Sequence, residues 1–251
     1  MLANERQNKI LELLSRGGVT TASLVETFNV SVETIRRDLL TMERAGLITR
    51  VHGGAVRHGS MKSYPTLSER NRTHEEQKRE LAEKAAALVC VGDIIGVDGG
   101  STAVFFAEEL SRRVSRLTVI TYSLDVFNIL SRISDFKVIL CGGTYMPEEN
   151  SFAGHMTIEA LSNIHVQKGF IFPSAVSMEN GIADFSEDIC PLQARLIRSS
   201  DEVFILADSS KFEKNALIRI DDMRKTYTYV TDSSLDESLK ELLLSLEYKI
   251  V

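Results

Sequence analysis

Short apolar runs alternate with segments of helical periodicity from residue 94 onward, and this alternation limits the fold more than any other feature of the sequence. Apolar strands separated by helices are typical of a parallel sheet that is covered on both faces. The predicted strands are Ile94–Val97, Leu117–Thr121, Lys137–Leu140, Gly169–Phe172, Val203–Ala207 and Thr226–Val230. The predicted helices are Thr102–Arg112, Leu124–Ser131, Met156–Asn163 and Glu187–Ser200. We therefore expect a doubly wound, mostly parallel α/β domain.

A polar segment without apolar periodicity precedes this domain. Residues 58–72 contain Pro65 and predict a linker. The helix predicted over residues 73–88 begins the second domain, with Thr73 as its N-cap. The expected division is thus a first domain over residues 1–57, the linker, and a second domain over residues 73–251.

The first 57 residues predict three short helices followed by a hairpin. The first helix, over residues 4–16, ends at two glycines, and Thr20 or Thr21 can cap the second helix. The third helix begins after a tight turn, with Ser31 as its N-cap. Residues 47–56 then alternate in polarity and break at a Gly-Gly pair, as a short β-hairpin does.

The third helix has one apolar and one polar face. Ile35, Leu39 and Met42 recur at helical spacing and should face the core. Two helices joined by a three-residue turn form a helix-turn-helix, whose second helix enters the major groove, and the hairpin would add a wing. The candidate DNA-binding residues are Thr20, Ser31, Glu33, Thr34, Arg36, Arg37, Arg50 and His52. A three-helix bundle whose arginines form a solvated face would show the same pattern, so the pattern alone leaves both interpretations open.

Charge is distributed unevenly along the chain. The whole sequence carries −6 at pH 7, which disfavours a protein that coats nucleic acid over its entire surface. Residues 1–57 carry +2, and the remainder carries −8. A mildly basic head therefore precedes an acidic body.

Glycine and polar residues follow four of the predicted strands, at the sheet edge where such folds bind ligands. Backbone N–H groups at a helix N-terminus favour a phosphate or other anion, and glycines permit its close approach. The candidate effector-binding residues are Asp98, Gly99, Gly100, Ser101, Thr102, Tyr122, Ser123, Gly142, Gly143, Asp208 and Lys211. Any single junction is equally well an ordinary turn or helix cap. Together they predict an anion-accepting crevice.

Three motifs of the head are specific enough to indicate a family. They are Ser31-x-x-Thr34-Ile35-Arg36-Arg37-Asp38-Leu39, Gly46-Leu47-Ile48 and His52-Gly53-Gly54-Ala55. With them, the head closely resembles the N-terminal domain of DeoR-type bacterial transcription regulators. The resemblance implies that the third helix contacts an operator in double-stranded DNA and that the wing touches the adjacent backbone or minor groove.

The body carries motifs of the same family. They are Asp98-Gly99-Gly100-Ser101-Thr102, Ser123-Leu124, Gly142-Gly143-Thr144, Ser151-Phe152-x-Gly154 and Asp208-Ser209-Ser210-Lys211-Phe212. They resemble the DeoR-type effector domain, which is similar in fold to ribose-5-phosphate isomerase and typically senses phosphorylated sugars or related metabolites. The resemblance implies a regulator, by default a repressor, of a carbohydrate operon whose DNA binding responds to such an effector.

The body also departs from the family pattern. Tyr122 stands where an Asn is usual, Met146 where an Arg is usual, and Gln193-Ala194 where a Lys-Arg pair is usual. Residues 173–177 replace a glycine-rich, acidic turn. The sugar-facing side of the pocket is therefore expected to be altered.

Two other classes of protein compete with a regulator. A sugar-phosphate isomerase with an appended head needs a carboxylate base and an electrophile over the substrate. Asp98 and Asp208 occupy phosphate- and hydroxyl-type positions, and no motif positions a second acid, so we predict that the chain is not an enzyme. A structural DNA-associated protein would bind in a salt-sensitive way, with little sequence preference and no ligand response.

The remaining expectations concern environment and assembly. Cys90, Cys141 and Cys190 form no CxxC pair, so we expect reduced, mostly buried thiols, no metal and no cofactor. The apolar runs are shorter than the ~20 residues that span a bilayer, and the first residues show no secretory signal, which predicts a cytoplasmic protein. A symmetric homodimer or homotetramer would place two heads on repeated half-sites.

Overall fold

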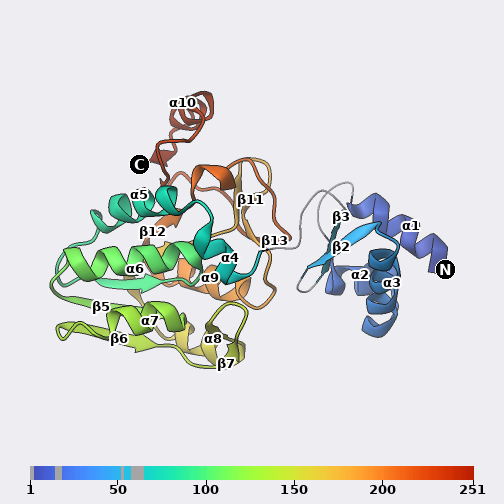
Figure 1. Ribbon diagram of the computed structural model, residues 1–251, viewed down its shortest axis with the longest axis horizontal. Coiled ribbons are helices and arrows are strands. Elements are labelled where there is room, and N and C mark those ends of the chain that lie inside the picture. The colour runs from blue at the N-terminus through green and yellow to red at the C-terminus, as the bar shows by residue number, and fades with distance from the viewer. Residues whose placement is uncertain (1–2, 15–18, 52–53, 58–64) are drawn as a thin grey trace.

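The computed structural model describes residues 3–14, 19–51, 54–57 and 65–251. These residues form an N-terminal body of short helices and a larger α/β body (Figure 1). The two glycines expected to end the first helix, Gly17 and Gly18, lie outside the described residues.

The N-terminal body is the predicted winged helix-turn-helix. Its elements are α1 (Ala3–Leu14), β1 (Val19–Thr20), α2 (Thr21–Phe28), α3 (Val32–Arg44), β2 (Ile48–Val51) and β3 (Gly54–Arg57). The strands β2 and β3 pair as an antiparallel hairpin, and β1 adds a third strand beside β3. Ile10, Leu24, Ile35, Leu39 and Met42 are fully buried between the helices, so the apolar face of α3 points inward as its spacing predicts.

The larger body contains a seven-stranded parallel sheet. Its strands are β4 (Ile94–Val97), β5 (Leu117–Thr121), β6 (Phe136–Leu140), β9 (Val166–Ile171), β12 (Ser200–Leu206), β14 (Thr228–Val230) and β15 (Lys249–Ile250). They are ordered β15-β14-β12-β9-β4-β5-β6, and every neighbouring pair is parallel. The chain therefore runs outward from β4 to β6 and then returns to the other side of β4. Ligands of such sheets bind where this reversal separates two adjacent strands, here β4 and β9.

Helices cover both faces of the sheet, as the continuous apolar strands predict. They are α5 (Glu75–Ala86), α6 (Ser101–Arg113) and α7 (Leu124–Leu130) on one face and α8 (His155–Ser162), α9 (Cys190–Arg198) and α10 (Glu237–Ser245) on the other (Figure 1). On the first face Phe106 of α6 packs on Phe170 of β9, which stacks on Phe204 of β12. On the second face Leu192 and Leu196 of α9 are buried against the sheet. The fold is thus a doubly wound α/β domain.

Several short elements were absent from the predicted set. They are the hairpin β7 (Thr144–Met146) and β8 (Ser151–Ala153), the antiparallel sheet of β10 (Ala175–Ser177), β11 (Gly181–Asp184) and β13 (Ile218–Asp221), the short 3-10 helix η1 (Ser209–Lys211), and the final helix and strand, α10 and β15. The strands among them have only two to four residues, too few to show a period of their own.

A helix lies inside the segment that the sequence predicts as a linker. This helix, α4 (Leu67–Arg72), begins with a capping box in which Thr66 and Glu69 satisfy each other's backbone N–H groups. The prediction that Thr73 caps the next helix is wrong. Thr73 instead ends α4 and donates to the Arg70 carbonyl, and α5 follows His74, whose φ is +53°.

The burial of the cysteines and the length of the helices can be compared with what the sequence predicts. Cys141 and Cys190 are buried as expected, whereas Cys90 is exposed. Burial raises the pKa of the Cys141 thiol to about 11. Within the described part of the chain, every helix is too short or too polar to cross a lipid bilayer.

Candidate functional site

The outer face of α3 carries polar side chains that the fold leaves accessible. Glu33, Arg36 and Arg37 are exposed, and Thr34 is half-buried beside the helix N-terminus. The side chains on the opposite face of α3 are buried, so these four residues lie on the side of α3 that a DNA groove can reach.

Two of the other candidates have a structural role in the head. The Thr20 hydroxyl accepts from the Ser23 backbone N–H at 2.9 Å and caps α2. The Ser31 hydroxyl accepts from the Thr34 backbone N–H at 3.2 Å and caps α3. The two caps therefore fix where α2 and α3 begin.

The wing candidates are only partly described. Arg50 on β2 is exposed, and its guanidinium lies 3.8 Å from the Glu43 carboxylate at the end of α3. His52 falls outside the described residues.

An ion pair that was not among the candidates fixes α3 against α1. The Arg6 guanidinium contacts the Asp38 carboxylate at 2.5 Å, and both side chains are buried. The Gln7 amide donates to the second Asp38 oxygen at 3.2 Å. Because breaking a buried pair leaves an uncompensated charge, this contact holds the orientation of the recognition helix. The signal in the sequence was an aspartate beside Leu39 on the apolar face of a helix.

Asp98, directly after β4, lies buried beneath the residues that line the candidate ligand site and is not exposed to a ligand. It is fully buried, and one carboxylate oxygen accepts from the Tyr122 hydroxyl and from the Gly99 N–H. The other oxygen accepts from the Phe172 N–H and the Gln193 amide, each at 2.9 Å. Burial raises the pKa of Asp98 to about 6, against the opposing effect of these donors. A carboxylate with four donors is poorly placed to act as a catalytic base.

The N-terminus of α6 opens into a cleft. Gly100, the N-cap, has a φ of +103° that favours glycine, and no side chain caps the helix. Thr102 is 1% exposed, and its hydroxyl finds no hydrogen-bond partner among the described residues. Gly100, Ser101 and Thr102 line the cleft, whose interior space is about 280 Å³.

Three cations line the same cleft. Lys211 lies 3.8 Å from Asp208, whose carboxylate also accepts from Ser210. Arg70 and Lys78 approach from α4 and α5. Among the described lining residues, Asp208 is the one carboxylate that faces these three cations. The cleft therefore favours an anion.

Lys78 holds α4 and α5 together at the edge of the cleft. Its ammonium group donates to the Arg70 carbonyl and, at 2.6 Å, to the Thr73 carbonyl. Burial, together with the positive charge of the neighbouring Lys211, lowers the pKa of Lys78 to about 8. Burial also lowers the pKa of Lys211. A bound anion would therefore stabilise the protonated form of both amines.

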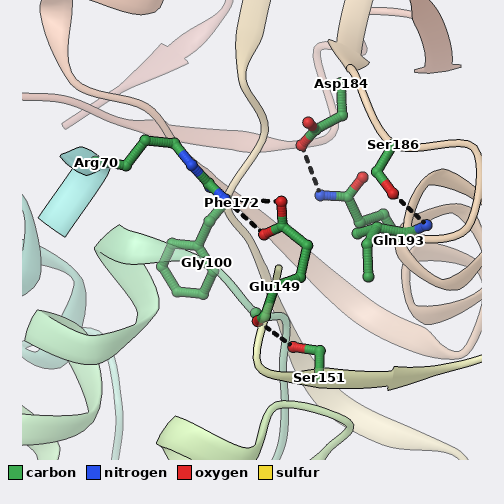
Figure 2. Close-up of a pocket in the computed structure, with 10 residues that line it drawn as sticks. Arg70, Gly100, Glu149, Ser151, Phe172, Asp184, Ser186 and Gln193 are labelled. Carbon is green, nitrogen blue, oxygen red and sulfur yellow. Dashed lines mark hydrogen bonds and ion pairs between the residues drawn. The ribbon is translucent and has the colours of Figure 1, made fainter. Parts of the chain in front are cut away.

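Arg70 connects this cleft with a second, smaller pocket. Its guanidinium donates to both carboxylate oxygens of Glu149, at 2.7 and 2.6 Å (Figure 2). Its Nε donates to the Pro65 carbonyl. Arg70, Gly100 and Phe172 line both cavities. The second pocket is narrow, with an interior space of about 20 Å³, which is room for one small polar group. Its other described lining residues are Gly99, Glu149, Ser151, Asp184, Ser186, Ile189 and Gln193.

The remaining candidates lie apart from both cavities. Ser123 is buried and caps α7 through the Val126 N–H. Gly142 and Gly143 lie after β6, where the Gly142 carbonyl accepts from Thr157. The strand order explains the separation: β9 lies between β4 and β12, whereas β5 and β6 lie on the far side of β4.

Sequence reasoning missed Arg70, Lys78, Glu149 and Asp184. Lys78 could have been found, because it lies on the same apolar face of the helix as Leu81 and Ala85. A lysine on such a face is buried, and a buried lysine needs a hydrogen-bond or charge partner. Arg70 had no such signal, since its helix is too short to show a period. Among the described residues, no group of His, Cys, Asp and Glu side chains is arranged to hold a metal ion.

A winged helix-turn-helix joined to an α/β body with an anion-favouring cleft is the architecture of a ligand-responsive transcription regulator. Comparison with known families agrees: the DeoR-like helix-turn-helix domain matches residues 6–60, and the DeoR C terminal sensor domain matches residues 73–233. The chain belongs to the DeoR family, and it is a DNA-binding transcription regulator rather than an enzyme.

Relatives match over nearly their whole length. The chain is 35% identical to the HTH-type transcriptional regulator YulB of Bacillus subtilis, covering 100% of this chain and 96% of the relative. It is 31% identical to the L-fucose operon activator of Haemophilus influenzae, covering 95% of each. It is also 31% identical to the glycerol-3-phosphate regulon repressor of Escherichia coli, covering 97% of this chain and 96% of the relative.

Solved structures are more distant. Ribose 5 phosphate isomerase A of Neisseria gonorrhoeae aligns with a TM-score of 0.42 and 20% identity, over 57% of this chain and 56% of that chain.

Proposed function

We propose that the protein represses a carbohydrate operon and that a phosphorylated sugar or related metabolite controls its binding to operator DNA. It acts in the cytoplasm, as a symmetric homodimer or homotetramer. Relatives named for the glycerol-3-phosphate regulon, the L-fucose operon and the lactose phosphotransferase system support a carbohydrate target.

The proposed domain division follows from the same function. Residues 1–57 bind DNA, residues 58–72 connect the domains, and residues 73–251 bind the effector and assemble the oligomer. The connection includes α4, whose Leu67 is buried and whose Arg70 is paired with Glu149. A movement of α4 is therefore a movement of the segment that leads to the head.

DNA contacts are assigned to the accessible face of α3 and to the wing. Glu33, Thr34, Arg36 and Arg37 face the major groove, with Arg50 and His52 contacting the flanking DNA. Thr20 and Ser31 cap their helices and present these helix N-termini to phosphates.

The effector's phosphate binds at the N-terminus of α6. The observation that carries this proposal is one cleft lined by Arg70, Lys78, Lys211 and the unpaired, buried Thr102 hydroxyl. A phosphate supplies the acceptor that Thr102 lacks among the described residues, and its charge suits a cleft in which three cations and one carboxylate, Asp208, are described in the lining. Gly100 and Ser101 complete the binding loop, with Asp208 orienting Lys211. Asp98, Gly99 and Tyr122 support the floor, and Ser123, Gly142 and Gly143 contribute indirectly, through the fold of the neighbouring loops.

The test removes one hydroxyl. Thr102→Val deletes a hydroxyl that has no hydrogen-bond partner in the described part of the chain, so the stability of the full chain should hold while phosphate binding weakens. Thr102→Ser keeps the hydroxyl and is the matched control. Isothermal titration with inorganic phosphate and a panel of sugar phosphates should rank wild type and Thr102→Ser above Thr102→Val, with Lys211→Ala also weakened. Equal binding by all four proteins would remove the phosphate site from this cleft.

A further inference from the structure

The second pocket, which Arg70, Gly100 and Phe172 share with the phosphate cleft, has a different chemical character. Its polar lining is dominated by acceptors: the carboxylates of Glu149 and Asp184 and the Gln193 amide oxygen (Figure 2). Arg70 is the single cation among its described lining residues, and both of its bonds to Glu149 are already formed.

The Gln193 amide uses its nitrogen in two hydrogen bonds, whereas its oxygen accepts none from the described residues. The Gln193 Nε2 donates to Asp98 at 2.9 Å and to Asp184 at 3.2 Å, and two carboxylate acceptors leave no doubt about which end of the amide is the nitrogen. The side chain is 1% exposed, and its Oε1 finds no donor among the described residues. A buried carbonyl oxygen without a donor costs about 1–3 kcal/mol, so the pocket gains from a ligand that donates to it.

The two carboxylates that flank this amide, Asp98 and Asp184, accept hydrogen bonds from uncharged donors. Among the described residues, Asp98 accepts from a phenol, two backbone N–H groups and the amide. Asp184 accepts from the Ser174 hydroxyl and the Phe185 N–H, each at 2.7 Å, and from the amide. Burial raises the pKa of Glu149, although Arg70 opposes this shift. A further negative charge brought into the pocket would meet repulsion from these carboxylates, and the one cation among the described lining residues, Arg70, is already paired with Glu149.

We infer that the second pocket binds the end of the effector remote from its phosphate, and that it selects an end that donates hydrogen bonds and carries no negative charge. The effector class is then a phosphomonoester with a hydroxyl-bearing or amine-bearing far end. Bisphosphates and phosphorylated sugar acids are excluded. The inference rests on the proposed phosphate site, since the phosphate determines which end enters the second pocket.

Matched pairs of probes test the selection. Glycerol 3-phosphate and 3-phosphoglycerate differ only in a terminal CH2OH or carboxylate, and so do glucitol 6-phosphate and 6-phosphogluconate. With the full-length protein at pH 7.5, calorimetry should give at least tenfold tighter binding of the alcohol in the pair whose length fits. The same alcohol should bind more tightly than inorganic phosphate.

Two substitutions locate the selection at Gln193. Gln193→Lys places a cation between Asp98 and Asp184 and should reduce the preference for the alcohol to about threefold or less. Gln193→Leu removes the acceptor at similar volume and should weaken the alcohol while leaving inorganic phosphate unchanged. Glu241→Ala, an exposed residue of α10 outside the described lining of both cavities, is the control and should leave every affinity unchanged.

The outcomes separate the inference from the function on which it rests. If wild type binds alcohol and acid equally, or binds no organic probe more tightly than inorganic phosphate, the selection is refuted and the phosphate site stands. If inorganic phosphate and every probe fail to bind, both proposals are overturned.

Discussion

Arg37 projects from the accessible face of α3, one residue before the buried Asp38. We predict that Arg37→Ala lowers operator affinity by about 1–3 kcal/mol without unfolding the head, because its side chain packs on nothing in the core. Mobility shifts on DNA selected from a random pool by wild type, run at several salt concentrations, measure the loss. Lys9→Ala, an exposed residue of α1, is the control. Unchanged affinity and unchanged salt dependence for Arg37→Ala would mean that DNA lies on another face.

Lys78 predicts how phosphate binding depends on pH. Its pKa of about 8 in the free protein means that it loses its proton between pH 7 and 9, and a cation lost from the cleft binds phosphate less well. We expect the affinity for inorganic phosphate to fall roughly tenfold over this range, about 1.4 kcal/mol. Lys78→Arg keeps its positive charge over this range, so its affinity for phosphate should depend less on pH than that of wild type. The dependence that remains is the one due to Lys211. Superimposable profiles would remove Lys78 from the site.

The same lowered pKa has a consequence for the unliganded protein. An unfolded lysine holds its proton to about pH 10.5, so between pH 8 and 10.5 the unfolded chain binds more protons than the folded one. The contribution of Lys78 to the free energy of unfolding therefore rises as the pH rises from 8 to 10.5. It falls again as the pH drops from 10.5 to 8, and below pH 8 it no longer changes because the lysine is protonated in both states. Bound phosphate, by favouring the protonated amine, should diminish this effect.

At the scale of elements, α4 is the part of the body that a ligand and the linker share. Arg70 bonds Glu149 and the Pro65 carbonyl, and its own carbonyl accepts from Lys78. A phosphate in the cleft competes with Glu149 for the Arg70 guanidinium, which changes the contacts that hold α4. The helix is thus a short connection between effector and head.

We predict that Arg70→Ala uncouples the effector from DNA. The ratio of operator affinities without and with effector, typically 5- to 150-fold in coupled systems, should approach one. Arg79→Ala, an exposed arginine on α5, should leave the ratio unchanged. The readout is a mobility-shift titration with the best-binding phosphate probe at saturation. A ratio equal to that of wild type in Arg70→Ala would place the coupling outside α4.

Long periodic elements could be predicted from the sequence, whereas short ones could not. The face of α3 followed from Ile35, Leu39 and Met42, and the main strands followed from continuous apolar runs. The helix α4 depends on a capping box in a polar segment and on one buried leucine, Leu67, so its formation requires the body to pack against. The hairpin of β7 and β8, which carries Glu149 in its turn, is too short to show alternation.

At the scale of the whole molecule, the strand order decided which candidates meet. Four strand ends looked alike in the sequence, but those after β5 and β6 lie on the far side of β4 from β9 and β12. Gly142 and Ser123 therefore fall outside the pockets, while Lys211 reaches the α6 N-terminus. Long-range strand order is set by packing between distant segments, which no local pattern encodes.

The proposed assembly predicts a repeated operator. A symmetric dimer or tetramer presents its heads in pairs, so DNA selected by the full-length protein should contain two half-sites, inverted or direct, at a fixed spacing. Sedimentation velocity should give an even number of protomers, alone and on DNA. A monomer bound to a single unrepeated site would contradict the assembly.

The pairing of β4 with β9 also sets the order in which a growing chain acquires its properties. The head's strands pair among residues close in sequence, Val19 with Ala55 and Ile48 with Arg57. Gly96 of β4, by contrast, cannot pair until Gly169 of β9 has been synthesised, and β9 cannot complete its own pairing until β12 has been synthesised. Contacts between near residues form fastest. During synthesis, the head should therefore be folded while the sheet beneath the effector cleft is still incomplete, and a chain halted within the body would hold a structured DNA-binding domain that no metabolite controls.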